Sequence, residues 1–324
     1  MKFLLTTGLC VMLTACSTRY HRDYPSYKAA ISREAPVIFN DQEIRLDANE
    51  KVDALFAGDS EFTPHSALLK QLSRRTCQLD VVPTGHQRLT PTEIYQQRIT
   101  SVVMVGSVYR CNRKTCKKNH FNPASGVIIH KDGVVVTNYH VVEARTTPTM
   151  IAIAVRTFDG RVFSVEEVLA ADKTNDVAVL KLKGSKDLAA APIFNDEPVG
   201  QSVTLIAHPV GRFYTLTRGY ISRYFITQKN RVAMGITADY AKGASGGPIF
   251  NDRGDVVGLV SSTRSVPYTS VPLSADPETG ALQIMEKGGE PVTVDDQNII
   301  LGLNHQMTFK QAVPSRCIMN LIRN

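Results

Sequence analysis

From Ser101 onward the chain consists of short runs of β-branched and apolar residues that are separated by turn signals. Segments such as SVVMVGSVYR (101–110), NDVAVLKL (175–182) and SVTLIAH (202–208) have the length of single strands. The sequences KDG, FDG and DRG between such runs are typical of hairpin turns. Many short strands without intervening long helices favour an antiparallel barrel or sandwich, so the sequence predicts a mainly β domain.

The first residues have the layout of an export signal, with one lysine before a short apolar run that ends in small residues, MKFLLTTGLCVMLTACS. The run is too short to cross a bilayer as a helix. Residues 13–16, Leu-Thr-Ala-Cys, resemble the lipobox of bacterial lipoproteins. We expect residues 1–15 to be removed and a lipid on Cys16 to anchor the chain, and Ser17 indicates the outer membrane of a Gram-negative cell. The alternatives are a plain signal peptide and an apolar start without a role.

Residues 16–89 are expected to join this anchor to the β domain. Their first part is polar and aperiodic, which is typical of a tether. Helices are expected at 63–75 and at 89–99, where Thr90 and Glu93 can form a capping box.

The end of the sequence and its most basic segment also carry predictions. Residues 309–322 predict a closing helix with Pro314 at its start. The formal net charge is +7, and much of the excess lies in RCNRKTCKKNH at 110–120. This segment is interpreted as a solvated loop, with a patch for anionic polymers or acidic partners as the alternative. No aromatic residues are interleaved with its charges as in a nucleic-acid groove.

Four cysteines follow the anchor, namely Cys77, Cys111, Cys116 and Cys317. Because exported proteins fold in an oxidising compartment, disulfides are the expected state, and four cysteines allow three pairings. Cys111 with Cys116 is the preferred short bridge, which leaves Cys77 for Cys317. Cys111, Cys116 and His120 are an alternative set of metal ligands, but a fourth ligand is not evident and no metal is expected.

Three polar residues stand in turns at strand ends, in the order His140, Asp176, Ser245. They occur in VVVTNYHVVE, in NDVAVLKL and in GASGGPIF. Each residue alone is ordinary in a turn. Attack of a hydroxyl on a carbonyl, however, needs a base for the serine proton and a carboxylate that holds that base in the correct tautomer. The three types together therefore predict nucleophilic catalysis by the serine.

These segments resemble the motifs of trypsin-like serine peptidases, and among them those of the bacterial HtrA-type proteases. The order of the three residues is the same, and TNYHVV, NDVAVLKL, GASGGPIFNDRGDVVGLVSS and AHPVGRFYTLTRGYIS are similar to segments of that group. The resemblance implies a mainly β, trypsin/chymotrypsin-like fold of two β-barrels over residues 90–324. A partly helical N-terminal extension and a C-terminal helix would complete it.

The resemblance also implies roles for single residues. His140 would act as general base and then as general acid, Asp176 would orient it, and Ser245 would be the nucleophile. The backbone N–H groups of Gly243 and Ser245 would form the oxyanion hole, which stabilises the negative charge of the transition state.

Four further residues match positions that bind substrate. Ser261, Ser262 and Thr263 match the strand edge that pairs with the substrate backbone. Asp239 matches the base of the primary specificity pocket of trypsin, where it would favour Arg or Lys at the cleaved bond. HtrA-type proteases usually prefer small aliphatic residues, and Thr263 would narrow the pocket, so the alternative for Asp239 is an ordinary loop carboxylate.

The sequence thus predicts a lipid-anchored serine endopeptidase of the cell envelope that needs no cofactor. Its partners would be protein or peptide substrates rather than nucleic acid. No PDZ domain is expected, because few residues follow the substrate-binding edge and they end in a predicted helix. The alternative hypothesis is a protease-like fold kept as a catalytically silent or latent binding or chaperone module.

Overall fold

The computed structural model describes residues 37–57, 61–143, 150–228, 230–267, 273–275, 282–284, 292–293 and 305–322. The predicted signal and Cys16 lie outside these residues. All elements described below belong to the unit Asn40–Asn324. No helix among the described residues is both long and apolar enough to cross a membrane.

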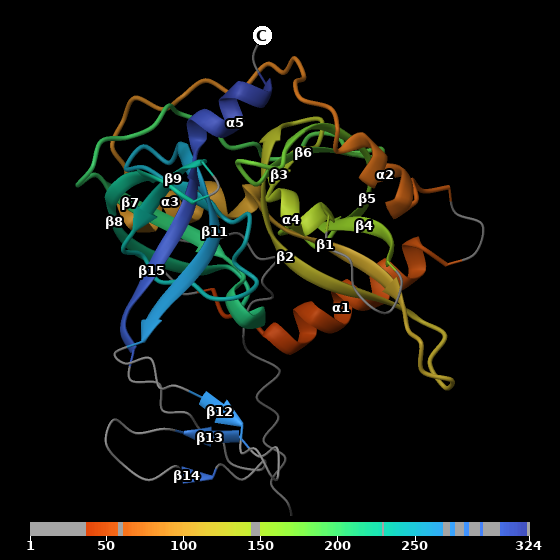
Figure 1. Cartoon of the computed structure of the whole chain (residues 1–324). Coiled ribbons are helices and arrows are strands. Elements are labelled where there is room, and N and C mark those ends of the chain that lie inside the picture. The colour runs from red at the N-terminus through yellow and green to blue at the C-terminus, as the bar shows by residue number, and fades with distance from the viewer. Residues whose placement is uncertain are drawn as a thin grey trace, which may run out of the picture. The chain divides into compact units, whose positions relative to one another are not determined.

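The first barrel is built from β1 Val102–Arg110, β2 Asn119–His130, β3 Val134–Thr137, β4 Met150–Arg156, β5 Val162–Asp172 and β6 Val177–Leu182. These antiparallel strands close in the order β1-β2-β3-β6-β5-β4 (Figure 1). The predicted hairpin turns are confirmed at Gly133 and Gly160, whose φ angles of 77° and 83° are accessible to glycine at little cost.

The second barrel is built from β7 Ser202–Ala207, β8 Thr215–Ile226, β9 Val232–Ile236, β10 Pro248–Phe250, β11 Val256–Pro267 and β15 His305–Pro314. It closes in the order β10-β11-β15-β9-β8-β7. A separate three-stranded sheet contains β12 Leu273–Ala275, β13 Leu282–Ile284 and β14 Val292–Thr293. The predicted mainly β fold of two barrels is confirmed.

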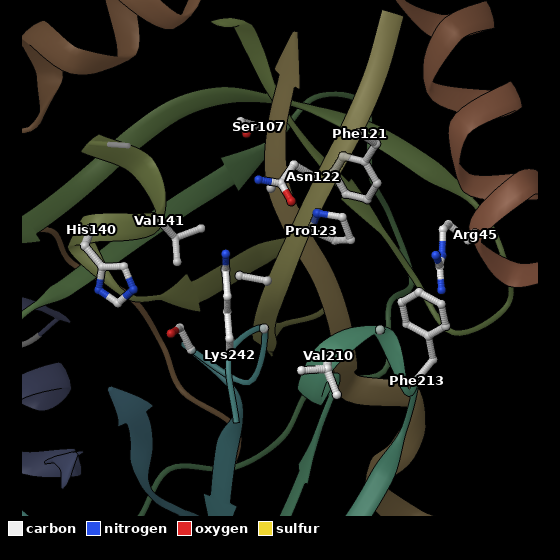
Figure 2. Close-up of a pocket in the computed structure, with 15 residues that line it drawn as sticks. Arg45, Ser107, Phe121, Asn122, Pro123, His140, Val141, Val210, Phe213 and Lys242 are labelled. Atoms are coloured by element: carbon white, nitrogen blue, oxygen red, sulfur yellow. The ribbon is translucent and has the colours of Figure 1, made fainter. Parts of the chain in front are cut away.

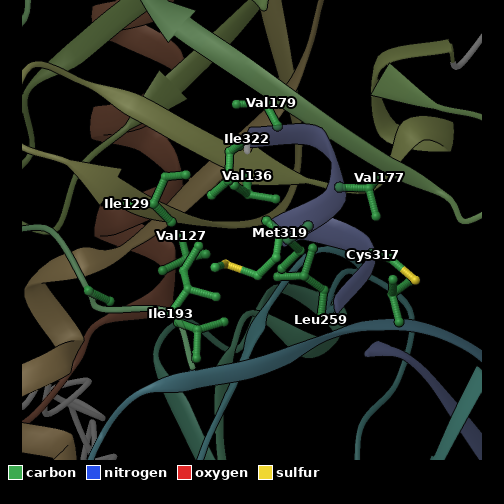
Figure 3. Close-up of a cluster of buried hydrophobic side chains, with 14 of the residues drawn as sticks. Val127, Ile129, Val136, Val177, Val179, Ile193, Leu259, Cys317, Met319 and Ile322 are labelled. Carbon is green, nitrogen blue, oxygen red and sulfur yellow. The ribbon is translucent and has the colours of Figure 1, made fainter. Parts of the chain in front are cut away.

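The C-terminal helix α5, Ser315–Ile322, supplies side chains to a hydrophobic cluster shared by both barrels. Its Met319 and Ile322 lie with Val136 of β3 and Leu259 of β11 (Figure 3). The predicted C-terminal helix is confirmed, and it begins directly after Pro314. The earlier residues of the segment 309–322 belong to β15, because pairing with β11 and β9 satisfies their backbone groups as strand.

Helices also precede the first barrel: α1 Asp41–Leu55, α2 His65–Gln71, α3 Pro91–Arg98 and the 3₁₀ turn η1 Ile99–Ser101. Both predicted helices are confirmed in shorter form, and Thr90 and Glu93 form the expected capping box. Helix α1 was not predicted. Its signals are the Asn40 side chain, which accepts hydrogen bonds from the first turn, and the buried face formed by Ile44, Ala48 and Val52.

A buried ion pair fixes α1 to the first barrel. The side chain of Arg156 at the end of β4 is fully buried, and its Nη2 lies 2.6 Å from Oδ2 of Asp47. Arg156 Nε also donates to the same oxygen at 3.1 Å. These contacts and an ion pair with Lys51 hold the pKa of the Asp47 carboxyl below its ordinary value, against the raising effect of burial.

Replacing Asp47 by Ala should lower the free energy of unfolding by about 3 kcal/mol, because the variant leaves a buried guanidinium without its carboxylate. Urea unfolding at neutral pH measures the change. Glu50→Ala, at an exposed position of the same helix, is the matched control and should change it by no more than about 0.5 kcal/mol. Equal effects of the two substitutions would contradict an anchoring role for Asp47.

Candidate active site

His140 and Asp176 are joined by two kinds of hydrogen bond. His140 lies in the short helix α4, Tyr139–Glu143, directly after β3, and Asp176 lies in the turn before β6 with a φ of 60°. His140 Nδ1 donates to Oδ1 of Asp176 at 2.9 Å, and the His140 backbone N–H donates to the same oxygen at 3.1 Å. Because Nδ1 carries the proton, Nε2 of the neutral ring is an acceptor.

Further groups hold Asp176. Ser261 Oγ donates to its Oδ2 at 2.8 Å, and Arg231 Nη1 lies 3.9 Å from the same oxygen. Burial raises the pKa of the Asp176 carboxyl, but its interaction with His140 and the hydrogen bond from Ser261 lower it more, so the pKa lies below its ordinary value. The carboxylate is therefore ionised at neutral pH. Sequence reasoning missed these contacts of Ser261 and Arg231, since nothing local signals them.

Ser245 lies in the turn before β10, between glycines with positive φ angles. Gly243 and Gly246 have φ angles of 95° and 79°, and a Cβ at Gly246 would lie 2.3 Å from the Ser125 carbonyl oxygen. His140 and Ser245 line the same cavity of about 530 Å³ (Figure 2). The Ser245 hydroxyl donates to the Ser261 carbonyl at 3.4 Å, and among the described contacts it has no hydrogen bond with His140.

The turn leaves two backbone donors available. The Lys242 carbonyl accepts a hydrogen bond from Val210 N–H at 2.6 Å, and the Gly243 carbonyl accepts one from Ser125 Oγ at 2.9 Å. Both carbonyls are thus engaged by protein donors. The N–H groups of Gly243 and Ser245 donate to no acceptor in the described part of the chain. An oxyanion hole requires such free, fixed donors beside the nucleophile.

His208, which directly follows β7, supports the same turn. Its backbone N–H donates to Ser125 Oγ at 3.1 Å, and its Nδ1 accepts from Tyr214 N–H at 3.1 Å. A Cβ at Gly243 would lie 2.6 Å from the His208 carbonyl oxygen, so the close approach of the turn requires glycine. Complete burial lowers the pKa of His208 to about 3.

The predicted substrate edge lies beside the His140–Asp176 pair. Ser261, Ser262 and Thr263 of β11 line a second cavity, of about 810 Å³, together with both of these residues. Ser261 is buried, whereas Ser262 and Thr263 are exposed. The structure therefore brings this edge together with the predicted triad.

Asp239 lies elsewhere. Its side chain is 85 % exposed, forms an ion pair with Lys310 and lines neither cavity that contains His140. The next residue, Tyr240, has its hydroxyl 2.9 Å from the Ser262 carbonyl and 2.8 Å from the Gln311 carbonyl. These two hydrogen bonds hold the Tyr240 hydroxyl against the backbone of β11 and β15. This placement favours the loop-carboxylate alternative for Asp239.

The four described cysteines are free thiols, so neither predicted bridge is formed in the structure. Cys77 and Cys317 nevertheless pack in one hydrophobic cluster. The sulfur of Cys116 lies 3.2 Å from Nε2 of His120, and the ligand atoms of Cys111, Cys116 and His120 lie within 4.8 Å of one another. The two disulfide pairings stay predictions. The alternative of a metal site also stays open, because the three candidate ligand atoms lie close enough together to bind one ion.

Comparisons with known proteins agree with this geometry. Residues 124–259 match the family described as trypsin-like peptidase domain, and this segment contains His140, Asp176 and Ser245. The chain is similar to trypsin-like peptidases. It is 36 % identical over 174 residues to the "Probable periplasmic serine endoprotease DegP-like" of Hahella chejuensis, covering 50 % of this chain and 34 % of that protein.

Two further similarities extend the comparison. The "Magnetosome formation protease MamE" of Paramagnetospirillum magneticum is 28 % identical over 194 residues, which cover 56 % of this chain and 26 % of that protein. The alignments thus span about a third of the length of these curated relatives or less. The solved structure "HtrA-type protease AlgW with decapeptide" has a TM-score of 0.51 at 18 % identity, covering 71 % of this chain and 66 % of that one. This last likeness concerns the fold alone.

The buried His208 predicts a distinct acid response. The unfolded chain protonates this residue near its ordinary pKa of 6.5, whereas the folded protein does so only near 3. Folding stability is therefore lost as the pH falls below about 6.5, by roughly 1.4 kcal/mol per pH unit from this group. In urea unfolding between these pH values, His208→Gln should lose stability less steeply than the wild type. The exposed His86→Gln should follow the wild type. Parallel curves for His208→Gln and the wild type would exclude this role.

Proposed function

We propose that this protein is a serine endopeptidase with Ser245 as nucleophile, His140 as general base and acid, and Asp176 as the orienting carboxylate. The observation that carries the proposal is the hydrogen-bonded His140–Asp176 pair, whose His140 lines one cavity together with Ser245 and Gly243, the residues that carry the free N–H groups. The similarity to DegP-like serine endoproteases supports the same activity.

The geometry suggests how the residues would act. Rotation of the Ser245 hydroxyl away from the Ser261 carbonyl would bring it to Nε2 of His140, which accepts its proton as the oxygen attacks the peptide carbonyl. The oxyanion would accept hydrogen bonds from the Gly243 and Ser245 N–H groups. The imidazolium, stabilised by ionised Asp176, would then protonate the leaving amine, and water would release the acyl group by the same route.

The cellular setting is part of the proposal. The similar DegP-like proteins are named periplasmic, which supports an envelope location. We propose that residues 1–15 are a lipoprotein signal, that the lipid on Cys16 holds the protein at the outer membrane, and that residues 16–89 connect it to the protease domain at 90–324. Substrates would be envelope or extracellular proteins, cleaved without a cofactor.

Ser245→Ala should abolish both peptide hydrolysis and covalent labelling by a fluorophosphonate, since the variant lacks the attacking oxygen. Asp176→Asn should lower kcat by about ten thousandfold, because an amide favours the wrong tautomer of the base. Ser73→Ala, an exposed serine of the N-terminal segment, is the matched control and should retain both signals.

Labelling that persists in Ser245→Ala would reject Ser245 as the nucleophile. Wild-type protein that neither labels nor cleaves would support the alternative of a catalytically silent binding or chaperone module. Labelling that appears only after an activator is added would support latency, to which the observed direction of the Ser245 hydroxyl corresponds.

The position of Tyr240 predicts which substrate side chains the site accepts at the cleaved bond. Because the Tyr240 hydroxyl is held against the backbone of β11 and β15, we expect its ring to narrow the pocket, so that the site accepts small side chains such as Ala or Val and rejects Arg and Lys. A peptide-library cleavage profile tests this preference. Asp239→Ala should leave the profile unchanged, whereas loss of a basic preference in that variant would place Asp239 in the pocket.

A further inference from the structure

We infer that the cavity on the leaving-group side of Ser245 binds acidic residues of the substrate, and that Arg45 of α1 and Lys242 of the Ser245 turn select them. The inference rests on the proposed peptidase function and extends it from the reaction to the class of substrate. It also gives the N-terminal segment a role in the site.

The position of this cavity relative to the scissile bond follows from the two cavities that meet at His140. One is lined by Ser261–Arg264, the edge expected to pair with the residues before the cleaved bond. The other is lined by Ser245 and Gly243 and by no residue of β11. A substrate in extended conformation continues past the nucleophile in one direction. The residues after the cleaved bond therefore enter the second cavity.

The chemistry of this second cavity is apolar and cationic. Its walls include the apolar side chains of Phe121, Pro123, Val141, Val210 and Phe213. Lys242 lies on the His140 side of the cavity and Arg45 on the Phe213 side (Figure 2). No Asp or Glu is among the described residues that line it. Low-dielectric walls strengthen the attraction of such cations for an anionic ligand.

The two cations are also not neutralised by their neighbours. Neither Arg45 nor Lys242 has an ion pair or a side-chain hydrogen bond in the described part of the chain. Two acidic residues of α1 are engaged elsewhere: Asp41 accepts from Phe213 N–H at 2.9 Å and pairs with Arg212, and Asp47 pairs with Arg156. The two charges are therefore available to a substrate.

The backbone next to the cavity accommodates Arg45. Gly211 has a φ of 73°, and a Cβ built there would lie 3.3 Å from Nη2 of Arg45. The guanidinium thus lies against the loop whose Val210 N–H holds the Lys242 carbonyl. Helix α1, fixed to the first barrel by its ion pair, thus carries this positive charge beside the site.

The test compares quenched fluorescent peptides that share one cleavable sequence and differ only in carrying Glu, Gln or Lys at the second and third residues after the cleaved bond. In the wild type at low salt, kcat/KM should be roughly three- to tenfold higher for the Glu peptide than for the Gln peptide, and lowest for the Lys peptide. The Glu/Gln ratio should shrink as salt is added.

Variants assign the preference to the two cations. The double variant Arg45→Gln, Lys242→Gln should bring the Glu/Gln ratio to about one, and Arg45→Glu with Lys242→Glu should favour the Lys peptide. Ratios within one variant cancel any change in its overall rate. Lys186→Gln, which removes an exposed lysine outside the cavity, should keep the wild-type ratio.

A binding measurement separates this inference from the proposed function. Fluorescence anisotropy of the Glu and Gln peptides on Ser245→Ala protein requires no hydrolysis. Tighter binding of the Glu peptide, lost when Arg45 and Lys242 are also replaced by Gln, supports the site even if the wild type cleaves nothing. Equal binding of the two peptides, or a Glu preference that survives in the double variant, overturns the inference whether or not the wild type is a peptidase.

Discussion

The candidate site depends on the contact of the Ser245 turn, which belongs to the second barrel, with strand β2 of the first. Ser125 makes this contact twice, because its N–H donates to the Ser245 carbonyl at 2.9 Å and its hydroxyl donates to the Gly243 carbonyl. The same hydroxyl accepts from His208 N–H. Ser125 thus holds the turn that carries Ser245 against the barrel that carries His140 and Asp176. The candidate site therefore forms only when both barrels are folded.

The architecture could largely be predicted from the sequence, because β-branched runs and Gly-containing turns specify strands locally. His140, Asp176 and Ser245 could be proposed because the mechanism requires their three types together, and the structure places all three at one site. Residues that act by long-range contact left no such signal. Ser125 and Arg231 are ordinary in their local sequence, and their importance comes from partners that only the fold brings near.

The features that the sequence did not settle have different causes. Residues 309–314 form a strand before the closing helix because pairing with two neighbouring strands satisfies their backbone groups. The role of Asp239 stays open, because a match in sequence spacing does not fix where a loop side chain points. The next residue, Tyr240, is hydrogen-bonded to the backbone of β11. The helix α1 was missed because a buried face of only three residues is a weak pattern beside many charges.

The place of β15 and α5 has a consequence for how the chain must fold. Strand β15 lies between β9 and β11, so the second barrel cannot close until residues 305–314 are available to pair with both strands. The α5 side chains then fill the cluster between the barrels. Contacts of such high sequence separation are slow to form. Because β10, which follows the Ser245 turn, belongs to this barrel, the candidate site would be completed only late in folding, after nearly all of the chain is available.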